Sequence, residues 1–325
     1  MAIPSQLLSS SKMPIIGSPL FIISTPDLVI AQCKSGVIGT FPALNARPQA
    51  ELDSWLSLIE HELEEFKKAN PDKTPAPYGV NQIVHQSNDR LAQDFETIID
   101  HKVPLIITSL GLPDKSYIDR IHEYGGVIMS DVINVRHARK AIGAGADGLV
   151  LVCAGAGGHA GTLSPFALLS EVREFFDGPI ALSGSIANGQ SILSAQALGA
   201  DFAYIGTAFI AAEEANADSG YKQALVECSA NDIVYSSLFT GVKGNYLKPS
   251  IENAGLDPND LPEADKNTMN FGSGGNTDAK AWKDIWGAGQ GTGSISKVET
   301  VQEVVARFEN EYLGALSKLK HSVRY

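Results

Sequence analysis

A glycine-rich segment with a single histidine is the part of the chain best suited to chemistry. Residues 150–161 read VLVCAGAGGHAG, an apolar run leading into a loop where glycines and alanines surround His159. Such a backbone can approach a flat ligand closely and adopt positive φ angles. Histidine is also the side chain whose ordinary pKa lies nearest neutrality. We therefore take His159 as the candidate catalytic residue. The alternative is a tight strand-to-helix turn in which the histidine only caps the next helix.

Two further small-residue turns have the composition of a phosphate site. Residues 183–189 read SGSIANG and residues 205–207 read IGT, each after an apolar run and at the start of a helical pattern. Backbone N–H groups and hydroxyls at helix N-termini bind phosphate. The residues expected to hold it are Ser183, Gly184, Ser185, Ile205, Gly206 and Thr207. A phosphate beside small residues around a ring-sized space suggests flavin mononucleotide (FMN), and ordinary tight turns are the alternative.

These turns must be positioned by the apolar runs that precede them. Eight such runs alternate with helical patterns over roughly the first 210 residues. The expected strands are Pro14–Ile16, Val37–Phe41, Tyr78–Val84, Leu105–Thr108, Val127–Asp131, Gly148–Val152, Ile180–Ser183 and Phe202–Gly206. The expected helices are Thr25–Lys34, Gln49–Ala69, Asn88–Ile99, Lys115–Tyr124, Asn134–Ala144, Pro165–Phe176 and Gly189–Leu198. Eight strand–helix units predict a (β/α)8 TIM barrel. A doubly wound sheet fits less well, because no G-x-G-x-x-G follows the first strand.

In such a barrel the active site lies at the C-terminal ends of the strands. Besides the turns above, those ends carry small or polar residues that we expect around a bound ring and its polar chain. They are Gly17, Ser18, Pro19, Asn81, Ser109, Asp131, Gly157 and Gly158. Asp131 is the one carboxylate at these ends, which disfavours a two-carboxylate glycosidase. No His-x-His or paired acidic cluster offers a metal cage, so no metal is expected.

The chain after the barrel reads as a smaller unit. We expect three parts: the barrel over 1–215, a helical and loop-rich lid over 216–285, and a part over 286–325 that packs back on the barrel. Residues 209–240 read as helix, 241–278 as a loop-rich stretch, and 296–318 as a final amphipathic helix. A glycine-rich loop over 286–294 precedes that helix.

Composition narrows the partners. The 325 residues carry a net charge of −12, which argues against nucleic acid or an anionic membrane as the main partner. No apolar run is long enough for a membrane span, and the N-terminus lacks a signal-peptide pattern. Cys33, Cys153 and Cys228 lie far apart, as in a reduced cytoplasmic protein. The oligomeric state stays open, with a homodimer as one candidate.

The motifs, in order, resemble those of the nitronate monooxygenase family, formerly called 2-nitropropane dioxygenases. Residues 14–19 (PIIGSP) resemble the family's first-strand motif, residues 79–81 (GVN) its third-strand motif, and residues 156–161 (AGGHAG) its catalytic histidine loop. Residues 183–189 with 205–207 are similar to its phosphate site. Residues 286–291 (WGAGQG) look like its closing segment near the flavin, which adds Gln290 and Gly291 to the cofactor-binding candidates. Residues 17–20 read GSPL where the family often has QGGM, and Asp131 stands where some relatives carry a basic or neutral residue.

The resemblance implies an FMN-dependent barrel that oxidises a small anionic nitro compound with O2 to a carbonyl compound and nitrite. Propionate 3-nitronate is one candidate substrate. His159 would act either as a base or as a cation that stabilises the anion. Three alternatives remain: an NAD(P)H:quinone or enoyl reductase on the same barrel, a non-catalytic flavin- or phosphate-binding module, and a flavin-free phosphosugar barrel.

Overall fold

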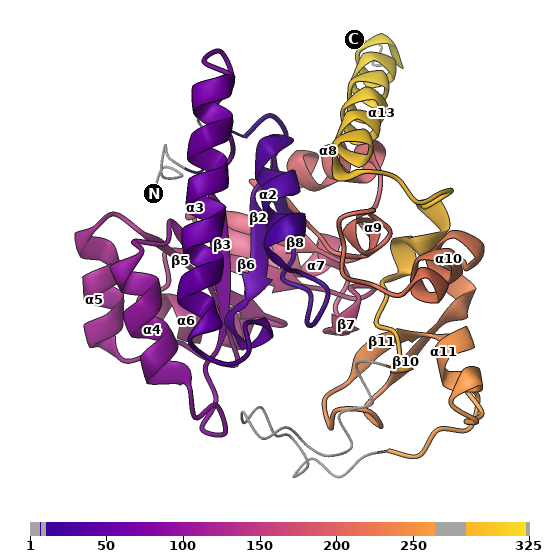
Figure 1. The fold of residues 1–325 in the computed structure, drawn as a ribbon. Coiled ribbons are helices and arrows are strands. Elements are labelled where there is room, and N and C mark those ends of the chain that lie inside the picture. The colour runs from indigo at the N-terminus through magenta and orange to yellow at the C-terminus, as the bar shows by residue number, and fades with distance from the viewer. Residues whose placement is uncertain (1–6, 8–10, 264–283, 323–325) are drawn as a thin grey trace.

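Eight parallel strands form a barrel at the centre of the molecule (Figure 1). The structure is a computed structural model that describes residue 7 and residues 11–263 and 284–322. The strands are β1 (Ile15–Gly17), β2 (Gly39–Pro42), β3 (Tyr78–Ile83), β4 (Leu105–Ser109), β5 (Val127–Val132), β6 (Gly148–Val152), β8 (Ile180–Ser183) and β9 (Phe202–Ile205). Their order is β1-β9-β8-β6-β5-β4-β3-β2. A parallel bridge between Ile16 and Ile38 joins β1 to β2 and brings the sheet round on itself. The predicted TIM barrel is confirmed.

Helices cover the outside of the barrel, one after almost every strand. They are α2 (Pro26–Lys34), α3 (Glu51–Ala69), α4 (Leu91–Asp100), α5 (Lys115–Glu123), α6 (Val135–Ala144), α7 (Pro165–Arg173) and α8 (Gly189–Ala197). Each lies within three residues of its predicted bounds. The residues before α2 do not cap this helix through their side chains. Thr25 precedes α2 without a side-chain cap bond, and the Ser24 hydroxyl instead accepts a hydrogen bond from the Leu20 N–H at 2.9 Å.

Alternate residues of the strands fill the interior of the barrel. Leu105 and Ile107 of β4, Met129 of β5, Val150 of β6 and Phe202 of β9 are fully buried in one apolar cluster. The residues between them pack outward against the helices, as the period of two along a strand requires. The same alternation places Asn81, Ser109 and Asp131 on the inner side, one layer nearer the C-terminal ends of the strands.

Residues 144–147 (AGAD) and 198–201 (LGAD) precede β6 and β9, are similar in sequence, and have a structural role. Gly145 and Gly199 adopt left-handed φ angles of 109° and 101° at the ends of α6 and α8. Asp147 then accepts a hydrogen bond from the Ile128 N–H at 2.8 Å, and Asp201 accepts one from the Ile180 N–H at 2.7 Å. Each aspartate thereby fixes the start of the neighbouring strand.

The segment after the barrel contains strands that the sequence did not predict. Instead of one helical region over 209–240, the chain forms α9 (Thr207–Ile210), α10 (Ser219–Glu227), a 3-10 turn η2 (Ala230–Asp232) and the strand β10 (Ile233–Ser236). The strand β11 (Gly244–Leu247) and the helix α11 (Lys248–Asn253) follow. β10, β11 and the two-residue strand β7 (Gly158–His159) form an antiparallel sheet in the order β10-β11-β7. The rest of the expected loop, over 264–283, lies outside the described residues.

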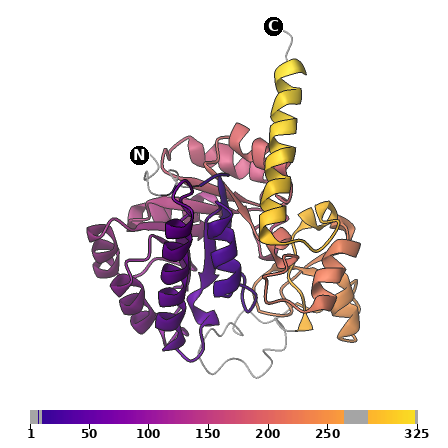
Figure 2. The same ribbon diagram turned by 45° about the horizontal axis from the view of Figure 1, so that its top comes forward.

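The chain ends in the helix α13 (Val301–Ser322), which begins five residues later than predicted. The delay arises because Glu299 forms a parallel bridge with Ala212, and the Glu214 carboxylate accepts a hydrogen bond from the Val301 N–H at 2.9 Å. The first part of α13 packs beside α8, and its last turns extend past the barrel (Figure 2). In the described residues we find no helix with the length and apolarity needed to span a bilayer.

Candidate functional site

A small, partly open pocket with a cavity volume of about 20 Å³ lies where β8 and β9 end. It is lined almost entirely by backbone and small side chains. The lining residues are Gly155, Ala156, Gly157, Ser183, Gly184, Ser185, Ile186, Ala187, Tyr204, Gly206, Thr207, Gly289 and Gly291. The structure thus brings the predicted turns after the seventh and eighth barrel strands together with the glycine loop after β6. Among the described residues, no lysine or arginine lines the pocket, so these residues could hold an anion only through N–H groups, hydroxyls and helix N-termini.

Two glycines of this pocket adopt conformations that few other residues take. Gly184 has φ 129°, and a Cβ there would lie 2.7 Å from the Ala154 carbonyl oxygen. Gly155 has φ 82°, and a Cβ there would lie 2.1 Å from the Ser185 Oγ. Ser185 itself has φ 57°, unusual for a residue with a side chain. The turn is therefore held in a strained shape, as is common where backbone contacts a ligand.

The segment at 288–291 closes one side of the pocket, as the family resemblance led us to expect. The Thr207 hydroxyl accepts a hydrogen bond from the Gly289 N–H at 2.9 Å, and the Gly155 carbonyl accepts one from the Gln290 N–H at 2.9 Å. A Cβ at Gly289 would lie 2.6 Å from the Gly155 oxygen. Gln290 begins the 3-10 helix η4 (Gln290–Ser294), and its own side chain is exposed. Gln290 therefore borders the pocket without lining it.

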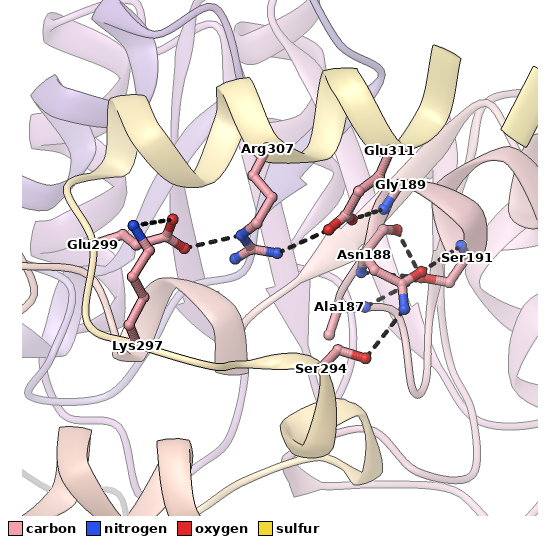
Figure 3. A network of polar contacts seen from close by, with 9 residues as sticks. All are labelled: Ala187, Asn188, Gly189, Ser191, Ser294, Lys297, Glu299, Arg307 and Glu311. Carbon is pink, nitrogen blue, oxygen red and sulfur yellow. Dashed lines mark hydrogen bonds and ion pairs between the residues drawn. The ribbon is translucent and has the colours of Figure 1, made fainter. Parts of the chain in front are cut away.

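The C-terminal helix braces the loop behind this pocket (Figure 3). Asn188 caps α8 by accepting a hydrogen bond from the Ser191 N–H at 2.8 Å, and its amide donates to the Ser294 hydroxyl at 3.1 Å. Glu311 of α13 accepts a hydrogen bond from the Gly189 N–H at 2.8 Å. Arg307 lies between Glu299, at 2.9 Å, and Glu311, at 3.6 Å. The predicted Asn188–Gly189 helix start is confirmed.

A second group of predicted residues forms a polar chain inside the barrel. The Asn81 amide donates to the Ser109 Oγ at 2.9 Å, and the Ser109 hydroxyl donates to Asp131 Oδ2 at 2.6 Å. Burial raises the pKa of Asp131 to about 6 from 3.8, although the Ser109 hydrogen bond lowers it in part. The other oxygen, Oδ1, is buried and has no hydrogen-bond partner among the described residues. Such an atom calls for a ligand or a proton to satisfy it.

Tyr204 connects these two groups, and the sequence analysis missed it. Its side chain lines the pocket at the end of β9, and it is buried. Burial raises the pKa of Tyr204 well above its ordinary value, and the charge of Asp131 raises it further. The tyrosine therefore stays protonated. The signal that could have revealed it is the alternation Phe202, Tyr204, Gly206, which places all three on the inner side of β9.

His159 is held by the three-stranded sheet rather than by the barrel. It pairs with Gly244 of β11, and the Asn245 amide donates to the Ala156 carbonyl at 2.6 Å. The ring Nε2 lies 2.9 Å from the hydroxyl oxygen of Thr240. Burial lowers the pKa of His159 to about 4 from 6.5, so the imidazole is neutral at pH 7. Thr240 and Asn245 are residues that sequence reasoning missed.

The first-strand residues serve a different purpose from the pocket. A Cβ at Gly17 would lie 2.3 Å from the Gln32 side chain, so close packing of α2 requires this glycine. The Ser18 N–H donates to the Ile205 carbonyl at 2.8 Å, and the Ser18 Oγ lies 2.8 Å from where a Gly206 Cβ would be. The Ile205 side chain packs in the outer apolar core. Pro19 is half-buried beside them. These residues adjoin the pocket from the β1 side, but none of them lines it.

Other chemical candidates are accounted for by packing. Cys153 is buried, and its burial raises the pKa of the thiol to about 12, so the thiolate nucleophile is disfavoured. Tyr246 falls in the stretch expected to be loop-rich, but it is fully buried in β11 with its ring edge-on to Phe239. Over the residues that the structure describes, no group of three or more His, Cys, Asp or Glu side chains could hold a metal ion.

Comparisons with known proteins agree with this arrangement. Residues 5–311 match the family model described as nitronate monooxygenase. The nitronate monooxygenase of Paraburkholderia phytofirmans is 26% identical over 94% of each chain. A nitroalkane oxidase from Streptomyces ansochromogenes has a similar fold, with a TM-score of 0.76, 23% identity, and coverage of 97% of this chain and 100% of that one. FabK from Thermotoga maritima also has a TM-score of 0.76, with 23% identity over 98% of each chain.

The small-residue pocket lies at the C-terminal ends of the barrel strands, which is where the active sites of βα-barrel enzymes lie. Because the family model covers nearly the whole chain, the protein belongs to the nitronate monooxygenase family. It is therefore a flavin-dependent oxidoreductase.

Proposed function

We propose that the protein binds FMN in the barrel mouth and oxidises small alkyl nitronates with O2 to carbonyl compounds and nitrite. The proposal rests on the loop after β6, which contributes to the pocket and also carries the histidine. Gly157 lines the pocket, and His159, whose pKa burial lowers to about 4, lies two residues further along the same loop. A phosphate in the pocket would place the rest of a flavin along that loop and over the end of the barrel.

The residues present fit such a cofactor. The strained turn at Gly184 and Ser185 supports an anion held by backbone groups, because a side chain at Gly184 would collide with the Ala154 carbonyl. The unpartnered Oδ1 of Asp131 supports a polar group of the ligand above the barrel interior. Ser183, Gly184, Ser185, Gly206 and Thr207 would hold the phosphate. Gly157, Gly158, Gly291 and Gln290 would border the ring from one side, and Gly17, Ser18, Pro19 and Ile205 from the other. Asn81, Ser109 and Asp131 would lie beneath it.

His159 has two uses with substrates of this class. A nitronate is a carbanion equivalent whose charge lies on carbon and both oxygens, so an N–H of the neutral ring can donate a hydrogen bond to a nitro oxygen. With a neutral nitroalkane, the unprotonated ring nitrogen can remove the proton from the carbon next to the nitro group. A pKa near 4 favours these roles over that of a resident cation.

The overall reaction balances without another reductant. Two nitronate anions and one O2 give two carbonyl molecules and two nitrite anions. FMN, when bound, supplies the electron acceptor for the first step. The protein's residues bind the anion, orient its carbon and control the proton on His159.

The test is aerobic turnover of propyl nitronate by the FMN-loaded protein, with nitrite and O2 measured together. The proposal expects nitrite release at about two molecules per O2 consumed. Absence of nitrite, together with rapid NADH oxidation in the presence of a quinone or an enoyl thioester, would assign the site to a reductase instead. A protein that binds no flavin would contradict the FMN assignment.

A further inference from the structure

A buried tyrosine at the pocket has a hydroxyl with no partner in the protein. Tyr204, on β9, is 7% exposed and lines the pocket. Among the residues that the structure describes, its hydroxyl makes no hydrogen bond. Burying a hydroxyl without a hydrogen bond costs free energy, because the bonds that it makes to water in the unfolded chain are lost. The hydroxyl of Tyr204 therefore costs stability that a bound molecule could recover.

The other buried tyrosines show that Tyr204 is an exception. The described part of the chain has four buried tyrosines. The Tyr78 hydroxyl donates to Glu60 Oε1 at 2.8 Å. The hydroxyls of Tyr221 and Tyr246 also have polar contacts within the protein. Tyr204 is therefore the one of these four that lines the pocket and lacks a protein partner.

Tyr204 lies at the inner end of the pocket, nearer the barrel interior than the turns. It belongs, with Phe202, to the apolar cluster that fills the barrel. Gly206, whose turn is a candidate for holding phosphate, follows two residues later, which is about 7 Å along a strand. The phosphate turns and Tyr204 therefore reach different parts of a ligand that extends from the turns towards the barrel axis.

The charge near Tyr204 favours an uncharged group over a phosphate at this end. Burial raises the pKa of Tyr204 well above its ordinary value, and the negative charge of Asp131 raises it further. The hydroxyl therefore keeps its proton and can both donate and accept a hydrogen bond. The same carboxylate would repel a phosphate placed beside the hydroxyl. A neutral oxygen or nitrogen of the ligand has no such penalty.

We propose that Tyr204 is a cofactor-binding residue whose hydroxyl forms a hydrogen bond with an uncharged polar atom of the flavin, on its ring or its polyol chain. The inference rests on the proposed function, because it takes FMN as the ligand. The turns at 183–185 and 206–207 would hold the phosphate, and Tyr204 adds a side-chain hydroxyl that the fold leaves unsatisfied. This hydroxyl therefore lowers the stability of the apoprotein and raises its affinity for the cofactor.

The direct test is titration of the apoprotein with FMN and with riboflavin, which lacks the phosphate. Tyr204→Phe removes the hydroxyl and keeps the ring. We expect it to weaken the binding of both flavins by a similar factor, about three- to tenfold, the usual range for one hydrogen bond. A loss with FMN but not with riboflavin would place the hydroxyl on the phosphate and overturn the inference, as would unchanged affinities for both. If the unaltered protein bound neither flavin, the proposed function would fail, and this inference with it.

Urea unfolding of the apoproteins separates a binding role from a structural one. Because the Tyr204 hydroxyl has no protein partner, we expect Tyr204→Phe to be at least as stable as the unaltered protein. Tyr78→Phe is the matched control, because Tyr78 is 6% exposed, bonds Glu60 through its hydroxyl and lies outside the pocket lining. That variant should be less stable and should bind both flavins normally. A loss of stability in Tyr204→Phe as large as that in Tyr78→Phe would show that the hydroxyl serves the fold, and would contradict the inference.

Discussion

The two halves of the site are built in opposite ways. The pocket is made of backbone and small side chains from the turns after β6, β8 and β9, together with Gly289 and Gly291, and glycines with left-handed φ angles set its shape. The histidine is instead held by side chains and a strand from the segment after the barrel, with Thr240 at 2.9 Å from its ring. The shape of the pocket therefore requires small residues, whereas the placement of His159 requires particular side chains.

This difference separates the residues proposed to bind the cofactor from the residue proposed to react with the substrate. Under the proposed function, a cofactor held in the pocket would tolerate changes in residues 233–247, whereas the reactivity of His159 would depend directly on those residues. Substrate preference in such a barrel can therefore change through residues 233–247 while the cofactor site stays the same. Changes to each half should have distinct signatures.

The largest effect should come from removing the imidazole. His159→Asn should keep the visible flavin spectrum, because the pocket is untouched, and should lower turnover by about 10²–10⁴-fold, the usual contribution of a general base. Nitrite release and the flavin absorbance of the purified protein check the two parts. Normal turnover in this variant would remove His159 from the mechanism.

A change in the pocket should instead reduce flavin binding. Gly184→Ala places a Cβ 2.7 Å from the Ala154 oxygen at a left-handed φ of 129°. We expect flavin affinity to fall at least about tenfold, or ~1.4 kcal/mol, as measured by titration of the apoprotein with FMN. The control is Gly143→Ala in α6, where an added Cβ would have no described atom within 4 Å apart from its chain neighbours and the backbone of its own helix. That variant should bind flavin normally. Equal flavin affinity in the two variants would contradict the pocket assignment.

Asp131 and His159, both half-buried, should affect stability in opposite directions with pH. Burial raises the pKa of Asp131 to about 6 from 3.8, so the folded protein holds more protons there than the unfolded chain does. This contribution is fully present below pH 4 and is lost as pH rises through 6. Burial lowers the pKa of His159 to about 4 from 6.5, so its contribution is present above pH 6.5 and is lost as pH falls through 4.

Urea unfolding of the apoprotein at several values between pH 4 and 6.5 measures both contributions. As pH rises from 4 to 6.5, the free energy of unfolding of Asp131→Asn should rise by about 2 kcal/mol relative to that of the unaltered protein. Over the same rise in pH, the free energy of unfolding of His159→Asn should fall by a similar amount relative to the unaltered protein. Parallel curves for all three proteins would show that neither group titrates as its burial implies.

The smallest effect should come from the brace behind the pocket. Glu311→Gln weakens the 2.8 Å bond from the Gly189 N–H and the contact with Arg307. We expect a loss of about 1 kcal/mol in stability with turnover retained, as measured by urea unfolding and nitrite release. Glu309→Gln, which breaks an ion pair with the exposed Lys12, is the matched control and should change neither quantity. A large loss of flavin from the Glu311 variant would mean that the brace is part of the binding site.

The same contrast explains how far the sequence was informative. The barrel and the pocket follow from local patterns: apolar runs of strand length, glycines after helices, and small residues where strands end. The sheet that holds His159 was not predicted, because its strands have two to four residues and the strand that carries His159 pairs with a strand more than 80 positions later. The short strand Ile233–Ser236 carried no alternation long enough to distinguish it from the helix expected over 209–240. No local sequence pattern marks Thr240, because it contacts His159 only when β11 has paired with β7.

The most direct test of the central claim is to follow the visible spectrum of the FMN-loaded protein anaerobically, with propyl nitronate in one cuvette and NADH in the other. We expect propyl nitronate to bleach the flavin and NADH to leave its spectrum unchanged. Rapid bleaching by NADH alone would contradict it and assign the barrel to a reductase.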